Sequence, residues 1–518
     1  MDRTLNIRFT SDTHGYLYPT SYADTQEKPM GLMKLASEFP KDGNTLIIDG
    51  GDTLQGSPMT NLYHRLSEEE KAECLASQQY GAHPIAAMMN LAGYHFVTLG
   101  NHDFNYGVDA LAAYLNDLDA LCLCCNIRDR EGRLPIAPYA IHELENGLRV
   151  GLVGACTHYV SRWENPATVA DLLIEEPVPA ARRALEAIRG RCDVTVMIYH
   201  GGFECDLATG ESLTDSAENE ACRICRELDF DVVLTGHQHM RVEGQRFANS
   251  FIVQPVYRAP HACAVTITVH DDGSKDFTGE LIPAQGQPLA GAAALLMPLE
   301  EKVQKWLDTP AGRLNMPLTA EDPLLSAVHG SALANFINTV QTITSGAQVS
   351  ACALPNEFKG LPMDVTIRDV VSTYIYSNTL VVLDLDRAAL KQYIERSAEY
   401  FDHDEAGNLK IADAFLLPKV EHYNYDRFSG IDYVIDTTRP AGDRVTSIRI
   451  AGHEMAEDER TTVCINSYRS SGTGGYDFLT RQKVVREVLV DVADAIIEYI
   501  TGNPQIEIDT HKYCTVIG

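Results

Sequence analysis

The sequence predicts an α/β domain followed by a smaller domain of mixed α and β structure. Two observations favour this fold class. Short apolar runs alternate with helical stretches up to about residue 285, and a long helix with a proline- and glycine-bearing segment after it separates this region from the rest. A chain of 518 residues is also long enough for two or more domains, each with its own core.

Six apolar runs in residues 1–285 read as buried strands, and each is followed by a polar or glycine-bearing turn. In chain order they are LNIRFTSD, NTLIIDGGD, YHFVTLGN, LRVGLVGAC, DVTVMIYHGG and FDVVLTGHQH. Strand, loop, helix and strand in succession indicate a sheet with helices on its faces. Ligands of such sheets collect at the carboxyl ends of the strands, so we expect the functional residues there.

Residues 286–323 are expected to link the two domains. The segment LAGAAALLMPLEEKVQKWL predicts one long helix, and the prolines and glycine of DTPAGRLNMPLTAEDPL end it. We expect the second domain to span residues 324–518 and to open with a helix in LLSAVHGSALANFINTVQ.

Composition excludes several classes of function. Hydrophobic residues make up 45% of the chain and charged residues 22%, which is typical of a globular protein. A formal net charge of -30 argues against a nucleic-acid polymer as partner, because no basic surface is available to replace its counterions. No segment reaches the roughly 18 apolar residues of a membrane span. The N-terminus shows no signal peptide, so we expect a cytoplasmic protein, and the oligomeric state stays open.

The 13 cysteines are expected to be reduced. Cys122, Cys124 and Cys125 fall in one predicted strand, whose alternate residues face opposite ways, so they do not suggest a disulfide framework. Cys222 and Cys225 form a C-x-x-C pair in a polar helical stretch with no second pair nearby. We therefore favour reduced structural thiols over a redox or zinc role for them.

Polar clusters occur at five of the predicted strand ends, which we expect at one edge of the sheet. The clusters contain Asp12 and His14, Asp52, Asn101 and His102, His200, and His237 and His239. Carboxylates, imidazoles and an amide oxygen form a ligand set that suits a pair of divalent ions such as manganese, zinc or iron.

Each cluster alone has a plainer interpretation. A single D-x-H usually has no function, and the GNHD segment could be an ordinary turn, since asparagine and aspartate favour turns. Five such clusters in order, each at a strand end, favour a two-metal site instead.

In this order the motifs D-x-H, GD, GNH[DE], a single histidine and GHxH resemble the calcineurin-like metallophosphoesterases. The resemblance implies a four-layer α/β/β/α domain and a two-metal centre. It implies that Asp52 bridges the ions, that one ion binds Asp12, His14 and His239, and that the other binds Asn101, His200 and His237. His102 would not be a ligand but would stabilise charge or protonate the leaving group.

Further segments are similar to the 5'-nucleotidase branch of this family, in which a second domain binds the nucleotide. VSTYIYSNTLVVLDLDRAALKQYIERSAEYF, YNYDRFSGIDYVID and INSYRSSGTGGYDF resemble the 2',3'-cyclic-nucleotide 2'-phosphodiesterase/3'-nucleotidases in particular. That resemblance implies two aromatic rings that stack on the base. Tyr468 is expected to be one, and Tyr425 the other, with Tyr423 as the alternative.

The chain also departs from the family pattern. The arginine with which 5'-nucleotidases contact phosphate is absent from SACALPNEFKG, where Phe358 and Lys359 match the cyclic-phosphodiesterase branch and are expected to bind substrate. The aspartate that pairs with the catalytic histidine is replaced by Asn105, so His102 lacks that carboxylate, and Asp103 cannot be assumed to supply it. The family is usually exported, whereas this chain shows no leader.

We therefore expect a two-metal enzyme in which an activated water attacks the phosphorus of 2',3'-cyclic nucleotides and 3'-nucleotides. A 5'-nucleotide, a nucleotide sugar or another phosphoester is the nearest alternative substrate. A non-catalytic nucleotide-binding protein and a plain protein phosphatase are alternatives of other kinds. The intact ligand set argues against the first, and the second domain argues against the other.

Overall fold

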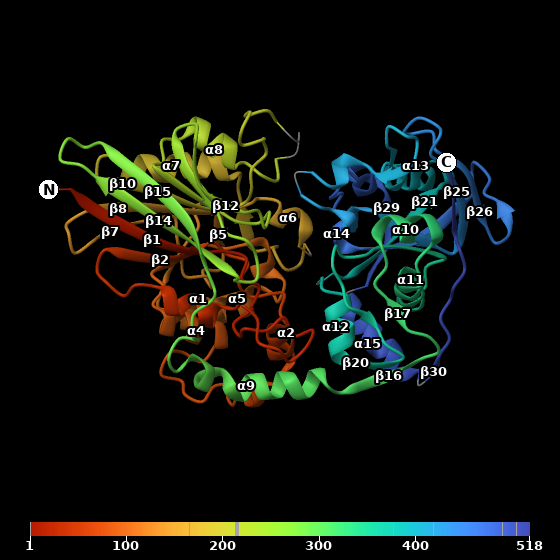
Figure 1. Ribbon diagram of the computed structural model, residues 1–518, viewed down its shortest axis with the longest axis horizontal. Coiled ribbons are helices and arrows are strands. Elements are labelled where there is room, and N and C mark those ends of the chain that lie inside the picture. Colours follow the sequence, from red (N-terminus) through yellow and green to blue (C-terminus); the bar gives the residue numbers. More distant parts are fainter. Residues whose placement is uncertain are drawn as a thin grey trace. The chain divides into compact units, whose positions relative to one another are not determined.

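The computed structural model forms two units, Met1–Gln304 and Lys305–Gly518, which Figure 1 shows in sequence colours. It describes residues 2–164, 166–212, 217–376, 378–417, 419–488, 490–503 and 505–518. Each unit has its own sheets and its own hydrophobic core, and each is described by itself below. Among the described residues, no helix combines the length and the apolar composition that crossing a membrane requires.

The first unit contains two large sheets. The first sheet has the order β15-β14-β1-β2-β3-β4-β6, with strands Lys275–Pro283, His261–Val269, Arg3–Thr10, Thr45–Asp49, Phe96–Val97, Leu121–Leu123 and Ile136–Ala137. The second has the order β12-β13-β11-β10-β8-β7, with strands Val242–Phe247, Ser250–Gln254, Val232–Thr235, Val194–His200, Arg149–Cys156 and Tyr139–Glu143. All six predicted strands are present. In the first sheet β1, β2 and β3 run parallel to one another, and in the second sheet β8, β10 and β11 do so.

The two sheets pack face to face, because alternate residues of each strand point inward. In β10, Val196 and Ile198 belong to the core that both sheets share, whereas Met197 and Tyr199 face a second core against α7 (Pro177–Ile188) and α8 (Ala221–Glu227). On the outer side of the first sheet Figure 1 shows α4 (Pro84–Ala92) and α5 (Val108–Asp117). The expected four layers, helix, sheet, sheet and helix, are confirmed.

The predicted long helix is α9, Ala292–Leu307, with Pro298 inside it. The boundary between the two units falls within this helix. The segment after it differs from the expected linker, because it forms β16 (Pro310–Leu314) and β17 (Leu318–Thr319). β16 pairs with β20 (Asp364–Thr366) and β30 (Gln505–Ile506), and β17 pairs with β19 (Gly360–Leu361). Residues 310–323 therefore belong to the second unit.

The second unit is built of small sheets and helices. Its five-stranded sheet has the order β24-β18-β28-β21-β29, with strands Asp426–Ser429, Val349–Ala353, Arg460–Asn466, Leu380–Asp386 and Lys483–Val488. A four-stranded sheet contains β27 (His453–Glu454), β26 (Val445–Ile450), β25 (Ile431–Asp436) and β31 (Cys514–Ile517). The main helices are α10 to α13 and α15, at Pro323–His329, Ala332–Ser345, Ile367–Thr373, Arg387–Ala398 and Val492–Gly502.

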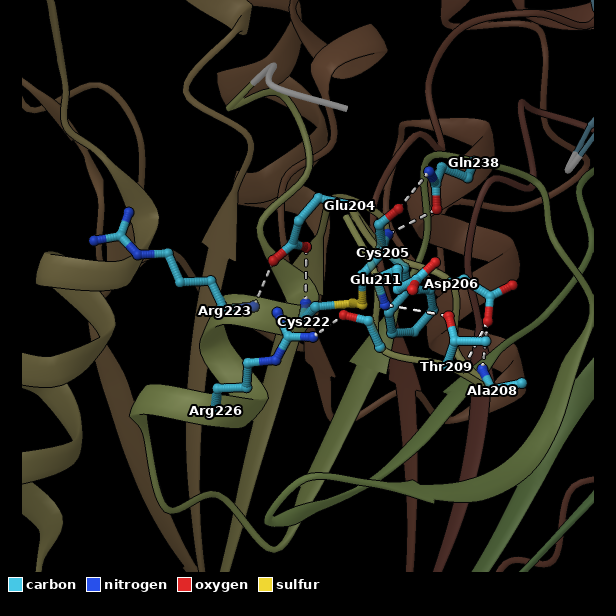
Figure 2. Close-up of a disulfide and its surroundings, with 12 residues drawn as sticks. Glu204, Cys205, Asp206, Ala208, Thr209, Glu211, Cys222, Arg223, Arg226 and Gln238 are labelled. Atoms are coloured by element: carbon cyan, nitrogen blue, oxygen red, sulfur yellow. Dashed lines mark hydrogen bonds between the residues drawn. A yellow bond between two sulfur atoms is a disulfide. The ribbon is translucent and has the colours of Figure 1, made fainter. Parts of the chain in front are cut away.

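A disulfide joins Cys205 to Cys222 (Figure 2). It ties the loop after β10 to the first turn of α8, where the backbone N–H groups of Cys222 and Arg223 also donate to the Glu204 carboxylate, at 2.9 and 2.6 Å. The expectation that all cysteines are reduced is therefore wrong for this pair. The partner of Cys222 lies 17 positions before it and not three positions after it, and Cys225 is a buried free thiol.

Candidate metal centre

The seven predicted metal ligands converge at one end of the first unit, but they come from two sheets and not from one edge. In the first sheet, β1 is followed by Asp12 and His14, β2 by Asp52 and β3 by Asn101. In the second sheet, His200 is the last residue of β10, and β11 is followed by His237 and His239. The carboxylate and imidazole donors form two groups, in each of which the atoms lie within 4.8 Å of one another: Asp12, His14 and His239, and Asp52, His200 and His237. Each group therefore takes residues from both sheets.

In the first group the ligand atoms of Asp12, His14 and His239 face one another. His14 Nδ1 lies 2.8 Å from the carbonyl oxygen of Gln55, to which it donates, so the lone pair is on Nε2. That Nε2 faces Nε2 of His239 at 3.2 Å, and the latter lies 3.4 Å from Oδ1 of Asp12. Two imidazole nitrogens and a carboxylate oxygen at these distances form a donor set that fits a metal ion.

In the second group, too, the ligand atoms face one another. His200 donates through Nδ1 to the carbonyl oxygen of Gly50 at 2.7 Å, which leaves Nε2 as the ligand nitrogen. Nε2 lies 3.2 Å from Oδ1 of Asn101 and 3.2 Å from Oδ2 of Asp52. Nδ1 of His237 lies 2.9 Å from the same amide oxygen. These four atoms are the set that the sequence predicted for the second ion, and the role of Asp52 as a bridge stays a prediction.

Five of the seven ligands have a left-handed backbone, which is uncommon for residues other than glycine. Their φ angles are 55° for Asp12, 50° for His14, 55° for Asp52, 71° for His237 and 57° for His239. Such conformations cost on the order of 1–3 kcal/mol each and persist where the surroundings fix them. The turns thus direct the ligand side chains inward, and the backbone at these five residues is strained as a result.

Two glycines let the backbone approach these ligands closely. A Cβ atom on Gly100 would lie 2.2 Å from both the backbone nitrogen and Oδ1 of Asp52, and one on Gly236 would lie 2.6 Å from Oδ2 of Asp12. The sequence motifs G-N-H and G-H-x-H therefore need glycine at these positions for space.

Burial shifts the pKa values of the ligand side chains. Asp12, Asp52 and His200 are at most 1% exposed. Burial lowers the pKa of His14, which favours the neutral imidazole that a metal requires. For His200 burial is also the largest effect and lowers the pKa, but the charge and hydrogen bond of Asp52, the charge of Asp12 and the hydrogen bond to Gly50 together outweigh it and raise the pKa to about 10.

His102 lies beside the first group, with its ring centroid 5.6 Å from that of His14. Its backbone N–H donates to Oδ1 of Asp52 at 2.7 Å, and its Nδ1 lies 2.8 Å from Oδ1 of Asn105. Asp103 points elsewhere: its carboxylate accepts backbone N–H groups of Gly100, Asp52, Thr53 and Leu54 at 2.7–3.0 Å. Asp103 therefore shapes the turn that carries Asp52.

Four residues at the site have no signal in the sequence. Glu218 lies 2.9 Å from Nε2 of His237 and orients that ligand, and Glu164 accepts a hydrogen bond from the amide of Asn105. Trp163 stacks on His237 with a centroid distance of 5.3 Å, and Tyr257 stacks on His239 at 4.3 Å. Only the replacement of the family's aspartate by Asn105 hinted that a carboxylate had to come from another segment.

In the second unit the structure corrects one predicted stacking residue. Tyr425 is 1% exposed and stacks on Tyr400 inside the hydrophobic core, with ring centroids 4.5 Å apart, so neither face of its ring is free for a base. The alternative, Tyr423, is half-buried and lies in a short turn of 3-10 helix. Its ring centroid is 6.5 Å from that of Tyr468, which is also half-buried and lies in α14 (Ser467–Ser470).

Phe358 and Lys359 lie in the loop after β18. Phe358 lines a pocket of about 320 Å³ together with His422 and Arg427, and Lys359 pairs with Asp369 at 3.0 Å. Their role in substrate binding stays a prediction.

Family models match both parts of the chain: calcineurin-like phosphoesterase over residues 5–241, and 5'-nucleotidase, C-terminal domain, over residues 318–481. The chain is 24% identical to a trifunctional nucleotide phosphoesterase protein of Bacillus subtilis, over 97% of this chain but only 38% of that relative's length. It is also 24% identical to a 2',3'-cyclic-nucleotide 2'-phosphodiesterase/3'-nucleotidase of Salmonella typhimurium, over 90% of this chain and 81% of the relative.

A solved structure from Staphylococcus aureus, assigned as a 5'-nucleotidase, superposes with a TM-score of 0.88 at 30% identity and covers 100% of both chains. A 5'-nucleotidase precursor from Thermus thermophilus superposes with a TM-score of 0.69 at 20% identity over 100% of both chains, which shows the same fold. The chain therefore belongs to the 5'-nucleotidase family, with a calcineurin-like phosphoesterase domain followed by a 5'-nucleotidase C-terminal domain.

Proposed function

We propose that this protein hydrolyses phosphoesters of nucleotides, with 2',3'-cyclic nucleotides and 3'-nucleotides as its substrates, and that two divalent ions such as manganese or zinc serve as cofactors. The observation that carries the proposal is the convergence of imidazole, carboxylate and amide donors in two groups whose lone pairs face one another. When bound, a pair of divalent ions supplies positive charge for phosphate oxygens and lowers the pKa of a bound water.

The metal-binding roles are assigned to seven residues of the first unit. Asp12, His14 and His239 would hold one ion, and Asn101, His200 and His237 would hold the other. Asp52 lies within contact distance of His200 and of the His102 backbone, which suits a carboxylate shared by the two ions.

His102 acts on the leaving group. With Nδ1–H donated to Asn105, the second proton of an imidazolium sits on Nε2. As the bond between phosphorus and the ribose oxygen breaks, its electron pair stays on that oxygen, which takes the Nε2 proton. His102 is then left neutral, with its remaining hydrogen on Nδ1.

Base recognition is assigned to Tyr423 and Tyr468 of the second unit. Both rings are half-buried, and their nearly perpendicular planes, 73° apart, mean that one ring has to turn before both can stack on one base. Stacking on an aromatic ring contributes ~1–3 kcal/mol per base and tolerates every base, because each has a π face.

A second candidate substrate is a 5'-nucleotide, which the likeness to the Staphylococcus aureus structure favours. Manganese-loaded protein assayed on 2',3'-cyclic AMP, 3'-AMP, 5'-AMP, UDP-glucose and p-nitrophenyl phosphate decides between them. Turnover fastest on the first two supports the proposal, and turnover fastest on 5'-AMP supports the alternative. Hydrolysis of the aryl phosphate alone would remove nucleotides as substrates.

The tyrosines are tested in the same assay. Tyr468→Ala and Tyr423→Ala should each raise KM for the nucleotide by ~5- to 150-fold at little change in kcat, and leave p-nitrophenyl phosphate turnover unchanged. Tyr468→Phe and Tyr423→Phe keep the ring and serve as matched controls. Equal losses on both substrates would indicate a folding defect, and no loss on either would show that the base is bound elsewhere.

A further inference from the structure

A carboxylate reaches His102 through one intervening amide. Glu164 directly follows the short helix α6 (Val160–Trp163), and its Oε1 accepts a hydrogen bond from Nδ2 of Asn105. The other end of the same amide, Oδ1 of Asn105, lies 2.8 Å from Nδ1 of His102. Glu164, Asn105 and His102 thus form a continuous chain of hydrogen bonds that links residues 59 positions apart in sequence.

The two ends of an asparagine amide differ in chemistry but hardly in shape, so a neighbour has to decide which end faces His102. Burial raises the pKa of Glu164 to about 7, so its carboxylate is ionised above that pH. In that form it only accepts hydrogen bonds, and it therefore selects the NH₂ end of Asn105. The carbonyl end is left to His102, where it can only accept. The hydrogen on the imidazole is thereby held at Nδ1, and Nε2 is directed away from Asn105.

We propose that Glu164 is a positioning residue for His102: through Asn105 it fixes the orientation and the hydrogen of the imidazole whose Nε2 serves the leaving group. This inference rests on the proposed role of His102 as the proton donor. In this chain the carboxylate thus acts on His102 through one intervening amide.

A positioning role can be separated from a structural one by the leaving group. Phenoxide is a poor leaving group that gains from a proton, whereas p-nitrophenoxide is a stable anion that departs without one. Loss of general-acid function should therefore slow phenyl phosphate far more than p-nitrophenyl phosphate. A structural defect would slow both equally. Neither substrate carries a base, so the outcome does not depend on whether nucleotides are the substrates.

The test compares kcat of wild type, Glu164→Ala and Glu164→Gln on the two aryl phosphates, with metal content measured for each protein. Glu175→Gln is the control, because that side chain is exposed and pairs with the exposed Arg183 at 2.7 Å. We expect Glu164→Ala to lose ~10²-fold on phenyl phosphate and less than about threefold on p-nitrophenyl phosphate. Glu164→Gln should lose less, because its amide oxygen can still accept from Asn105.

A second measurement shows whether Glu164 acts through His102. In the His102→Ala background, Glu164→Ala should cause no further loss on phenyl phosphate, since the residue it positions is gone. Equal losses on the two substrates, unchanged activity, or a full additional loss in the His102→Ala background would each overturn the proposal. If wild type cleaves aryl phosphates but no nucleotide, the proposed substrate falls while this test of Glu164 still applies.

Discussion

Gly100→Ala should disable the metal centre although it alters no ligand. The added Cβ atom would lie 2.2 Å from both the nitrogen and Oδ1 of Asp52, where contacts below about 3.4 Å are already tight. Asp52 cannot retreat freely. Its N–H donates to Asp103 at 3.0 Å, its Oδ1 accepts from His102 at 2.7 Å, and its backbone is already left-handed. Relief therefore requires a shift of about 1 Å and the loss of a hydrogen bond.

The magnitude follows from these contacts. Overpacking costs about 1–3 kcal/mol and a lost hydrogen bond about 1 kcal/mol, so the free energy of unfolding should fall by ~2–4 kcal/mol. A displacement of 1 Å at a reacting group costs on the order of 10²-fold in rate. We expect kcat on p-nitrophenyl phosphate to fall by about that factor and the bound metal to drop below two ions per chain.

Metal content by mass spectrometry, thermal unfolding and kcat check this prediction together. Gly502→Ala is the control, because a Cβ atom there meets no atom within 4 Å. Gly100→Ala with two bound ions and wild-type kcat would refute the argument that Gly100 is required for space beside Asp52.

Three further predictions concern stability and covalent structure. Burial raises the pKa of Asp49 from 3.8 to about 7, so the folded state retains a proton that the unfolded state has lost, and in chelator-treated protein the contribution of Asp49 to stability should fall by about 4 kcal/mol as pH rises from about 4 to about 7. Asp49→Asn should therefore lose less stability than wild type over this pH range in urea titrations, and an equal loss in both proteins would contradict this role of Asp49. Tyr425→Ala should destabilise the protein by about 3–5 kcal/mol, because the ring is 1% exposed, whereas Tyr423→Ala should lower the melting temperature little; equal melting temperatures would contradict the corrected assignment. Peptide mapping after alkylation without reductant should find Cys205 joined to Cys222 and the 11 other cysteines alkylated, and free Cys205 in freshly purified protein would contradict the disulfide.

The sequence predicted the strands and ligands of the first unit well because both are local patterns. An apolar run followed by a polar or glycine-bearing turn is visible without any knowledge of distant contacts, and β1, β2 and β10 all end in this way. The assignment of these strands to two sheets could not be read in this way. Parallel strands of either sheet look alike in sequence, since each is buried on both faces.

The errors in the second unit and at the disulfide have a similar origin. Tyr423 and Tyr425 are two positions apart, so in a strand both side chains would point to the same face. Tyr423 lies in a turn, where this rule does not apply, and sequence alone therefore could not decide which ring is buried. Cys222 has a near neighbour in sequence, Cys225, but its partner is Cys205 across a loop. Glu164 and Glu218 reach the site from loops that carry no periodic pattern, and only the folded backbone brings them there.

The division of each ligand group between two sheets has a consequence for how the protein folds. His14 and His239 lie 225 positions apart, and Asn101 and His200 lie 99 positions apart, so neither group exists until the two sheets have docked. Contacts of such separation close late, after the local strands and helices have formed. A divalent ion that prefers the complete sites should therefore leave the refolding rate nearly unchanged and act by slowing unfolding. We therefore expect the metal centre to be the last part of the first unit to assemble, and bound ions to stabilise a fold that forms without them.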